Sequence, residues 1–98
     1  MRIEFDWDPA KAASNIVKHG VTFVDAMSVL HDPLALSILD GSSQEERWAT
    51  LGLATTGKLL VVVHTWVDFG AESASVRIIS ARRPTRREAR QYREGETP

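Results

Sequence analysis

The residues with the greatest potential for chemistry are seven arginines between Arg77 and Arg93, a stretch in which Glu88 is the only acid. A guanidinium group offers several N–H donors in a planar fork, which can hold two phosphate oxygens at once. Arg86 and Arg90 lie four residues apart, so they share one face of a predicted helix with Arg93. A solvated helix face explains any one of these side chains, but the cluster as a whole predicts an anionic partner.

Two of the arginines precede this helix and differ from the others. Arg77 interrupts an apolar strand, so its charged end must reach an edge, a partner or a ligand. Arg82 stands where the same strand ends and can point into a cleft at the rim of the sheet. We expect these two side chains to hold a phosphate group. We expect four further arginines to contact the phosphates along a nucleic-acid backbone: Arg83, Arg86, Arg87 and Arg90.

Three side chains other than arginine are candidates for a site: His19, Glu46 and Tyr92. Imidazole both accepts and donates a proton near neutral pH, and His19 follows Lys18 at a predicted helix end, where cations also suit the helix dipole. Glu46 either acts as a general base that faces the arginines or pairs with a neighbour such as Arg47. Tyr92 either packs its ring or stacks a nucleobase. The choice between His19 and Glu46 as the base stays open.

The sequence predicts no metal site and no cofactor. Its three histidines have no shared metal-ligand spacing. His31 marks a helix end, and His64 lies inside an apolar strand, where we expect a hydrogen-bonded core residue. Cysteine is absent, which excludes a disulfide scaffold, a thiol nucleophile and a Cys-based zinc site, and which suits a reducing cytoplasm.

The charges are unevenly distributed over the 98 residues, although the formal net charge is only −1. Most acids lie in the first half of the chain, and most arginines lie in its last quarter. This asymmetry predicts nucleic acid as a partner, or an acidic protein that covers the basic surface. The longest apolar run, residues 59–63, is too short to cross a bilayer, and the N-terminus lacks the apolar core of a signal peptide, so we expect no membrane association.

The elements that must position these side chains follow from hydrophobic periodicity and capping residues. Alternation predicts a strand over residues 2–7, and a helix over residues 9–19 begins at the N-cap Asp8 and stops at Gly20. Thr22 begins a second helix. Helical spacing gives the first helix an apolar stripe made of Ala10, Ala13, Ile16, Val17 and Gly20.

The second half of the chain predicts strands and one final helix. Strands are expected over residues 34–39, 47–53, 59–67 and 76–82, with a polar loop over 40–44 and a looser connection over 68–75. Thr85 and Glu88 have the spacing of a capping box, and Gly95 is a fitting stop for the last helix. The order β-α-α-β-β-β-β-α predicts a single α+β domain spanning residues 1–98, with a mostly antiparallel sheet.

Four segments together resemble the BrnT family, the ribonuclease toxins of a type II toxin–antitoxin system. They are FDWDPAKAASNIVKHGVTF near the start, EERW in the middle, LLVVVHT in the predicted central strand and RIISARRPTRREARQY at the end. Each is weak alone, but the combination covers nearly the whole chain in the family's order. The resemblance implies a compact RelE-like fold, a cytoplasmic location and metal-independent endonuclease cleavage of RNA. It also implies neutralisation, as a heterotetramer, by a cognate antitoxin with a ribbon-helix-helix DNA-binding domain.

Carried over by position, the resemblance implies roles for particular residues. The matching positions are Lys18, His19, Glu46, Arg47, Arg77, Arg82, Glu88 and Tyr92. Among these we expect catalytic roles for Lys18, His19, Glu46, Arg77, Arg82 and Tyr92, and RNA binding by Arg47. The arginine cluster adds Arg83, Arg86, Arg87 and Arg90 to the expected RNA-binding residues. An arginine that the family often has after the central strand is Val67 here, so either this chain is less active or Arg77 and Arg82 carry more of the phosphate binding. The alternative is a binding module without catalysis, in which the arginine helix docks nucleic acid or an acidic protein and the histidines are structural.

Overall fold

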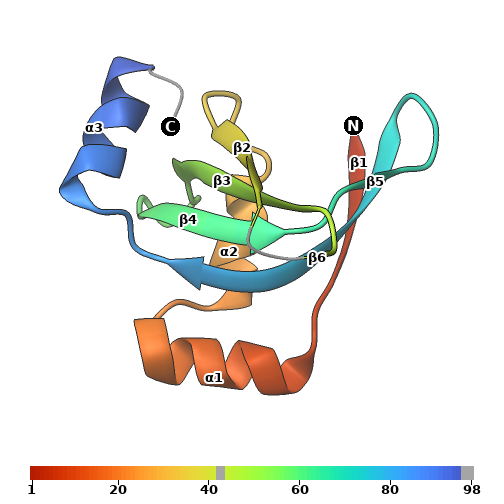
Figure 1. The fold of residues 1–98 in the computed structure, drawn as a ribbon, viewed down its shortest axis with the longest axis horizontal. Helices are drawn as coiled ribbons and strands as arrows, with labels where there is room; N and C mark the ends of the chain where they lie inside the picture. The colour runs from red at the N-terminus through yellow and green to blue at the C-terminus, as the bar shows by residue number, and fades with distance from the viewer. Residues whose placement is uncertain (42–43, 96–98) are drawn as a thin grey trace.

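A computed structural model of the chain describes residues 1–41 and 44–95; Ser42 and Ser43, in the predicted polar loop, lie outside the described residues. The described residues form six strands: β1 (Arg2–Asp6), β2 (Leu36–Asp40), β3 (Arg47–Leu53), β4 (Leu59–His64), β5 (Val67–Asp68) and β6 (Ser73–Arg82). The same residues form three helices: α1 (Pro9–His19), α2 (Phe23–Val29) and α3 (Arg86–Glu94). Figure 1 shows α3 at the end of the sheet where β4 begins and β6 ends, with α1 below β6.

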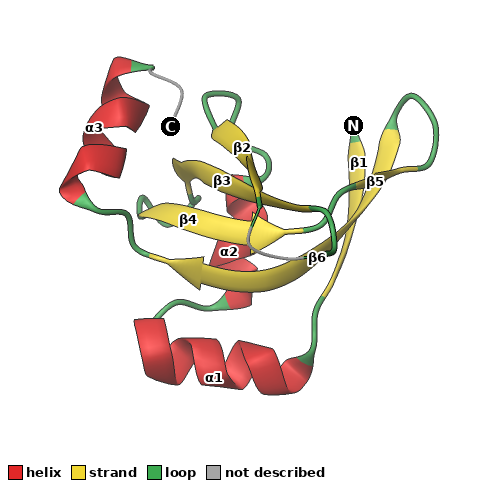
Figure 2. Ribbon diagram, in the orientation of Figure 1, coloured by secondary structure: helices red, strands yellow, loops and turns green. Residues whose placement is uncertain are grey.

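The strands pair in the order β1-β6-β4-β3-β2, and the short strand β5 also pairs with β6. β1 runs parallel to β6, whereas the other pairs are antiparallel (Figure 2). The predicted α+β class with a mostly antiparallel sheet is therefore confirmed. β6 contacts three other strands, so it is the centre of the sheet and the element from which α3 continues.

The prediction of one continuous strand over residues 59–67 is wrong. β4 ends at His64, and Val67 belongs to β5, which pairs with the beginning of β6 inside the predicted loop over residues 68–75. The pairing register of β4 with β6 shifts between Val63 and His64. Thr65 then donates its backbone N–H to the Arg77 carbonyl, and its hydroxyl accepts from the Arg77 N–H. A run of apolar and β-branched residues gives no sign of such an irregularity.

The hydrophobic core lies between the sheet and α2. Phe23, Ala26 and Val29 of α2 are at most 2% exposed and pack against the inward side chains of β4 and β6. Those inward side chains are Leu60, Val62, Val76, Ile78 and Ala81. Gly52 of β3 permits this close packing, because a Cβ at that position would lie 2.9 Å from the Cγ1 of Val29. Even an alanine there would push α2 away from the sheet.

The predicted apolar stripe of α1 is not its buried face. Ile16 is 49% exposed and Val17 is 90% exposed, whereas Asn15 is only 5% exposed. The amide of Asn15 donates to the carbonyl oxygens of Val21 and Ala81 and accepts from the Ala81 N–H. α1 is therefore attached to the edge of β6 by a buried polar side chain. Periodicity cannot reveal this because it counts asparagine as an outward residue.

The predicted helix ends are confirmed. Asp8 caps α1 by accepting from the Ala10 N–H, and Thr22 caps α2 by accepting from the Asp25 N–H. Thr85 begins α3 in a complete capping box with Glu88. Gly20 and Gly95 end α1 and α3 in the left-handed conformation, with φ of 67° and 72°, which glycine adopts at little cost.

Candidate functional site

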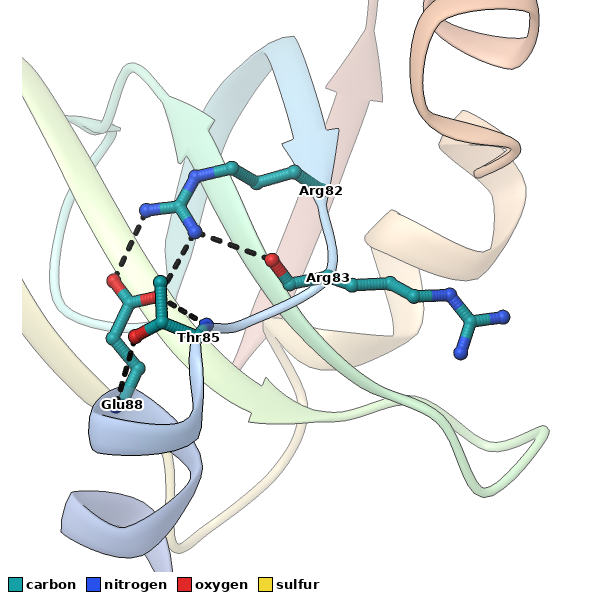
Figure 3. Close-up of polar contacts among 4 residues, drawn as sticks. All are labelled: Arg82, Arg83, Thr85 and Glu88. Carbon is teal, nitrogen blue, oxygen red and sulfur yellow. Dashed lines mark hydrogen bonds and ion pairs between the residues drawn. The ribbon is translucent and has the colours of Figure 1, made fainter.

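The helix α3 is attached to the end of β6 by an ion pair between Arg82 and Glu88 (Figure 3). Two guanidinium nitrogens of Arg82 lie 2.9 and 3.0 Å from the two carboxylate oxygens. Glu88 also accepts a 2.8 Å hydrogen bond from the Thr85 N–H. The hydrogen bonds from Arg82 are the main cause that lowers the pKa of Glu88 to about 2, against the opposing effect of partial burial. Arg82, which we expected to hold phosphate, thus already has a carboxylate partner.

Tyr92 attaches the same helix to a second part of the chain. Its hydroxyl donates a 2.6 Å hydrogen bond to the Oδ2 of Asp32, which also accepts from the Leu53 N–H. This bond raises the pKa of Tyr92 to about 12. Burial would raise the pKa of Asp32, but the bonds from Tyr92, Leu53 and Leu34 outweigh it and the pKa is lowered. The pair therefore joins a neutral phenol to a charged carboxylate and fixes α3 to the connection between α2 and β2.

The remaining arginines beside and within α3 are exposed. Figure 3 shows the guanidinium of Arg83 pointing away from Glu88. The exposed set comprises Arg83, Arg86, Arg87, Arg90 and Arg93. In the part of the chain that the structure describes, none of them forms an ion pair. Their charges are therefore available to an anionic partner.

Arg77 lies on β6 where that strand pairs with β1. Its Nε is 3.6 Å from the Oδ1 of Asp6, the residue directly opposite in the parallel register, and both side chains are largely exposed. The pair borders a polar hollow of about 270 Å³, which is also lined by Asp8 and Lys11 at the start of α1. Arg77 and Arg82 thus pair with carboxylates on different elements, β1 and α3.

Lys18 and His19 line a second hollow, of about 160 Å³, where the last turns of α1 meet β6. Lys11 and Ile79 line both hollows, so the two adjoin each other beside β6, and we treat them together as one groove. We call it the α1–β6 groove. Its ionisable and hydroxyl side chains are Asp6, Asp8, Lys11, Ser14, Lys18, His19, Arg77 and Ser80.

Glu46 and Arg47 lie elsewhere, at the start of β3, which β4 separates from β6. Arg47 is 3.6 Å from Glu45 rather than from Glu46, and Glu46 is exposed. The Nε of Arg47 is buried and makes no hydrogen bond to any described residue. Of the two candidates for the general base, only His19 lines the groove that Arg77 also lines.

His64 is a buried, hydrogen-bonded core residue, as predicted. It is 2% exposed, with Nδ1 2.8 Å from the Thr65 carbonyl oxygen and Nε2 2.7 Å from the Thr50 hydroxyl. The Thr50 hydroxyl lies 2.8 Å from that of Ser37. Burial lowers the pKa of His64, with the carbonyl bond acting in the opposite direction. Neither Ser37 nor Thr50 stands out in the sequence, because single hydroxyls in strands form no recognisable pattern.

The structure therefore distributes the predicted site residues over three places. His19, Lys18 and Arg77 border the α1–β6 groove, where Lys11 joins them although no sequence pattern pointed to it. The α3 region holds Arg82, Arg83, Arg86, Arg87, Arg90 and Tyr92. Glu46 and Arg47 lie at the start of β3.

Two kinds of feature are absent from the described residues. Within residues 1–41 and 44–95, no three or more His, Cys, Asp or Glu side chains are grouped so that they could hold a metal ion. No helix in the same residues is long and apolar enough to span a membrane.

Comparisons with known proteins give matches that cover most of the chain. Residues 7–88 match the family described as the ribonuclease toxin, BrnT, of a type II toxin–antitoxin system. The crystal structure of the Brucella abortus ribonuclease toxin BrnT has a similar fold, with a TM-score of 0.54 and 23% sequence identity, over 88% of this chain and 100% of that chain. At this identity the structural likeness concerns the fold alone. No curated protein matches the chain.

Proposed function

Because the chain belongs to the BrnT family of ribonuclease toxins of type II toxin–antitoxin systems, we propose that it cleaves RNA in the α1–β6 groove by acid–base chemistry that requires no metal ion. One observation carries the proposal: His19 lines one hollow of this groove together with Lys11 and Lys18, and Arg77 lines the adjoining hollow, which Lys11 shares. A proton-accepting group beside concentrated positive charge is what cleavage at a phosphodiester needs.

In the proposed reaction, His19 takes the proton of a ribose 2′-hydroxyl. The 2′-oxygen attacks the adjacent phosphorus, and the bond from phosphorus to the 5′-oxygen breaks, which leaves a 2′,3′-cyclic phosphate. Lys18, on the same turn of α1, gives a proton to the departing 5′-oxygen. Arg77 and Lys11 stabilise the additional negative charge on the phosphorane-like transition state. The Asp6 carboxylate holds the Arg77 side chain near the groove before RNA binds.

The exposed arginines of α3 supply the sequence-independent part of RNA binding. Guanidinium groups without an ion pair gain more from phosphate than groups that already hold a carboxylate. We therefore assign the RNA backbone to Arg83, Arg86, Arg87 and Arg90. Arg82 and Tyr92 act as positioning residues, because their bonds to Glu88 and Asp32 hold α3 in place.

Neutralisation is proposed to come from a cognate antitoxin in the cytoplasm, one that carries a ribbon-helix-helix domain and forms a heterotetramer with the toxin. Ile16 and Val17 support a protein contact on α1, because they are 49% and 90% exposed and directly precede Lys18 and His19. A partner that buried these two apolar side chains would close the groove at its His19 end.

The test is incubation of the purified chain with RNA in the presence of a metal chelator. Cleavage with 2′,3′-cyclic phosphate ends is the expected result. Cleavage that disappears in chelator and returns with Mg²⁺ would overturn the metal-independent mechanism but not the ribonuclease. Retardation of intact RNA on a gel, without any cleavage, would overturn both.

That last result would favour a second function, a basic binding module without catalysis. A specific observation supports it: Arg77 and Arg82, the two arginines expected to hold the scissile phosphate, both have carboxylate partners. In this case the exposed α3 arginines bind nucleic acid or an acidic protein, and His19 has no catalytic role.

A further inference from the structure

We propose that a pocket lined by Trp48 and Trp66 binds one base of the RNA and prefers a base edge that presents an N–H donor. The inference rests on the proposed RNA substrate, but it concerns a pocket outside the α1–β6 groove. The pocket has a volume of about 350 Å³, within the ~300–1,000 Å³ that is usual for small-ligand sites. Besides the two indoles, it is lined by Leu30, Ala35, Ser37, Thr50 and His64.

The two indoles provide apolar walls for a planar ring. Trp66 follows β4, and its indole N–H donates a 3.0 Å hydrogen bond to the Oδ1 of Asp68, which fixes the orientation of the ring. Trp48 lies on β3, directly opposite His64 of β4. Nucleobases stack on aromatic side chains with little regard to sequence, so these walls explain affinity for a base but not a preference among bases.

The preference follows from the direction of the hydrogen bonds among the polar residues. A carbonyl oxygen can only accept, so the Nδ1 of His64 must donate to Thr65. In a neutral imidazole Nε2 then has no proton and must accept from the Thr50 hydroxyl. Thr50 has a single hydroxyl proton, so its other bond must be donated by Ser37.

Ser37 therefore presents only lone pairs to a ligand, although a free serine could donate or accept. It is exposed on β2, so its oxygen is accessible from the pocket. A base edge with an amino or imino group facing Ser37 gains a hydrogen bond, whereas an edge that presents only acceptors leaves the lone pairs of the serine without a donor.

The experiment uses two ligands of nearly equal size: adenosine 5′-monophosphate, and purine riboside 5′-monophosphate, which lacks the 6-amino group and has no N–H on its base. Binding of each to the full chain is measured by calorimetry. We expect adenosine monophosphate to bind about fivefold more tightly, the effect of one net hydrogen bond. Ser37→Ala should remove this preference while both ligands still stack. Thr56→Ala, which removes an exposed hydroxyl from the β3–β4 turn at the opposite end of those strands, is the matched control and should keep it.

Replacing Trp66 by leucine should weaken the binding of both nucleotides about tenfold. Trp66 also packs against the core, so this variant can fail to fold. In that case the Ser37→Ala variant and its Thr56→Ala control decide the result. Equal affinity of the wild type for the two ligands, or the same preference in Ser37→Ala, would overturn the proposal. Absence of nucleotide binding, together with loss of antitoxin binding in a Trp48→Ala variant, would assign the pocket to a protein partner instead. RNA cleavage is measured separately, so a cleaving enzyme without nucleotide preference refutes only this inference.

Discussion

The hydroxyl of Tyr92 in α3 donates a 2.6 Å hydrogen bond to the carboxylate of Asp32, which lies 60 residues earlier in the chain. Asp32 also accepts from the backbone of Leu34 and Leu53, so one carboxylate joins α3, β3 and the α2–β2 connection. The position of the arginine-bearing helix therefore depends on a bond between a neutral phenol and an anion.

Removing that bond by Tyr92→Phe should lower the free energy of unfolding by about 1.5 kcal/mol, the usual contribution of a hydrogen bond to a charged group. The pKa of Tyr92 is raised to about 12 in the folded state from an ordinary 10.0. The stabilisation that the Tyr92–Asp32 hydrogen bond provides is therefore complete below about pH 10 and is lost as the pH rises towards about 12. Urea unfolding at about pH 8 and about pH 11 measures both effects. A variant as stable as the wild type at the lower pH would contradict this role.

Glu88→Gln tests the ion pair with Arg82, because glutamine keeps the capping box and removes the charge. The pKa of Glu88 is lowered from 4.5 to about 2. The stabilisation that the ion pair between Glu88 and Arg82 provides is therefore complete above about pH 4.5 and is lost as the pH falls through about 2. At neutral pH the variant should be less stable by about 1 kcal/mol, a small value because Arg82 is partly exposed. Denaturant unfolding should show the difference shrinking in acid; a constant difference would exclude the charge as its cause.

His19→Ala should lower the rate of RNA cleavage by about 10²–10⁴-fold, the usual contribution of a general base. His19 is exposed, so the variant should keep the thermal stability of the wild type. Glu46→Gln is the matched variant, since Glu46 was the other candidate and does not line the groove. Single-turnover cleavage of an RNA oligonucleotide compares them. Loss of cleavage in Glu46→Gln alone would transfer the base to the start of β3.

Combined replacement of Arg86, Arg87 and Arg90 by alanine should weaken binding of a non-cleavable 2′-O-methyl RNA and reduce its salt dependence. Each lost contact with a single-stranded phosphate should lower the slope of log affinity against log salt by ~0.7. Arg2→Ala, which removes a cation paired with Glu4 on β1, is the control and should keep the slope. Fluorescence anisotropy across a salt series measures it. An unchanged slope in the triple variant would remove α3 from the RNA-binding surface.

Asn15→Ala should lower the free energy of unfolding by about 3 kcal/mol, because it leaves the buried backbone N–H and carbonyl of Ala81 without partners. Val17→Ala on the same helix should change stability by less than about 0.5 kcal/mol, since Val17 is 90% exposed. Chemical denaturation of the two variants compares the observed buried face of α1 with the face that periodicity predicts. A larger loss of stability in Val17→Ala than in Asn15→Ala would contradict the buried face that the structure shows.

Local chemistry predicted the helix ends well. Asp8, Thr22 and Thr85 act as caps, and Gly20 and Gly95 end helices, because each of these depends on bonds within one turn. The orientation of α1 was not predictable in the same way. It depends on Asn15 meeting the backbone of Ala81, 66 residues away, and nothing near Asn15 in the chain signals that contact.

The candidate site shows the same limit. The arginine cluster near the C-terminus was apparent from composition, but Arg82 meets Glu88 and Arg77 meets Asp6 only once β6 and its neighbours have paired. His19 and Arg77 are far apart in the sequence, and the folded chain places them at two adjoining hollows beside β6. Which charges remain unpaired is a property of the tertiary structure, so residue types alone could not separate the exposed α3 arginines from those already neutralised.

The parallel pairing of β1 with β6 has a consequence for synthesis on the ribosome. β1 precedes the other described strands in the sequence, and its partner β6 occupies Ser73–Arg82, after all of them. A nascent polypeptide interrupted before that segment lacks the strand that joins β1 to β4, so the groove has only one of its two walls. A translation product truncated there would therefore lack the β6 side of the α1–β6 groove.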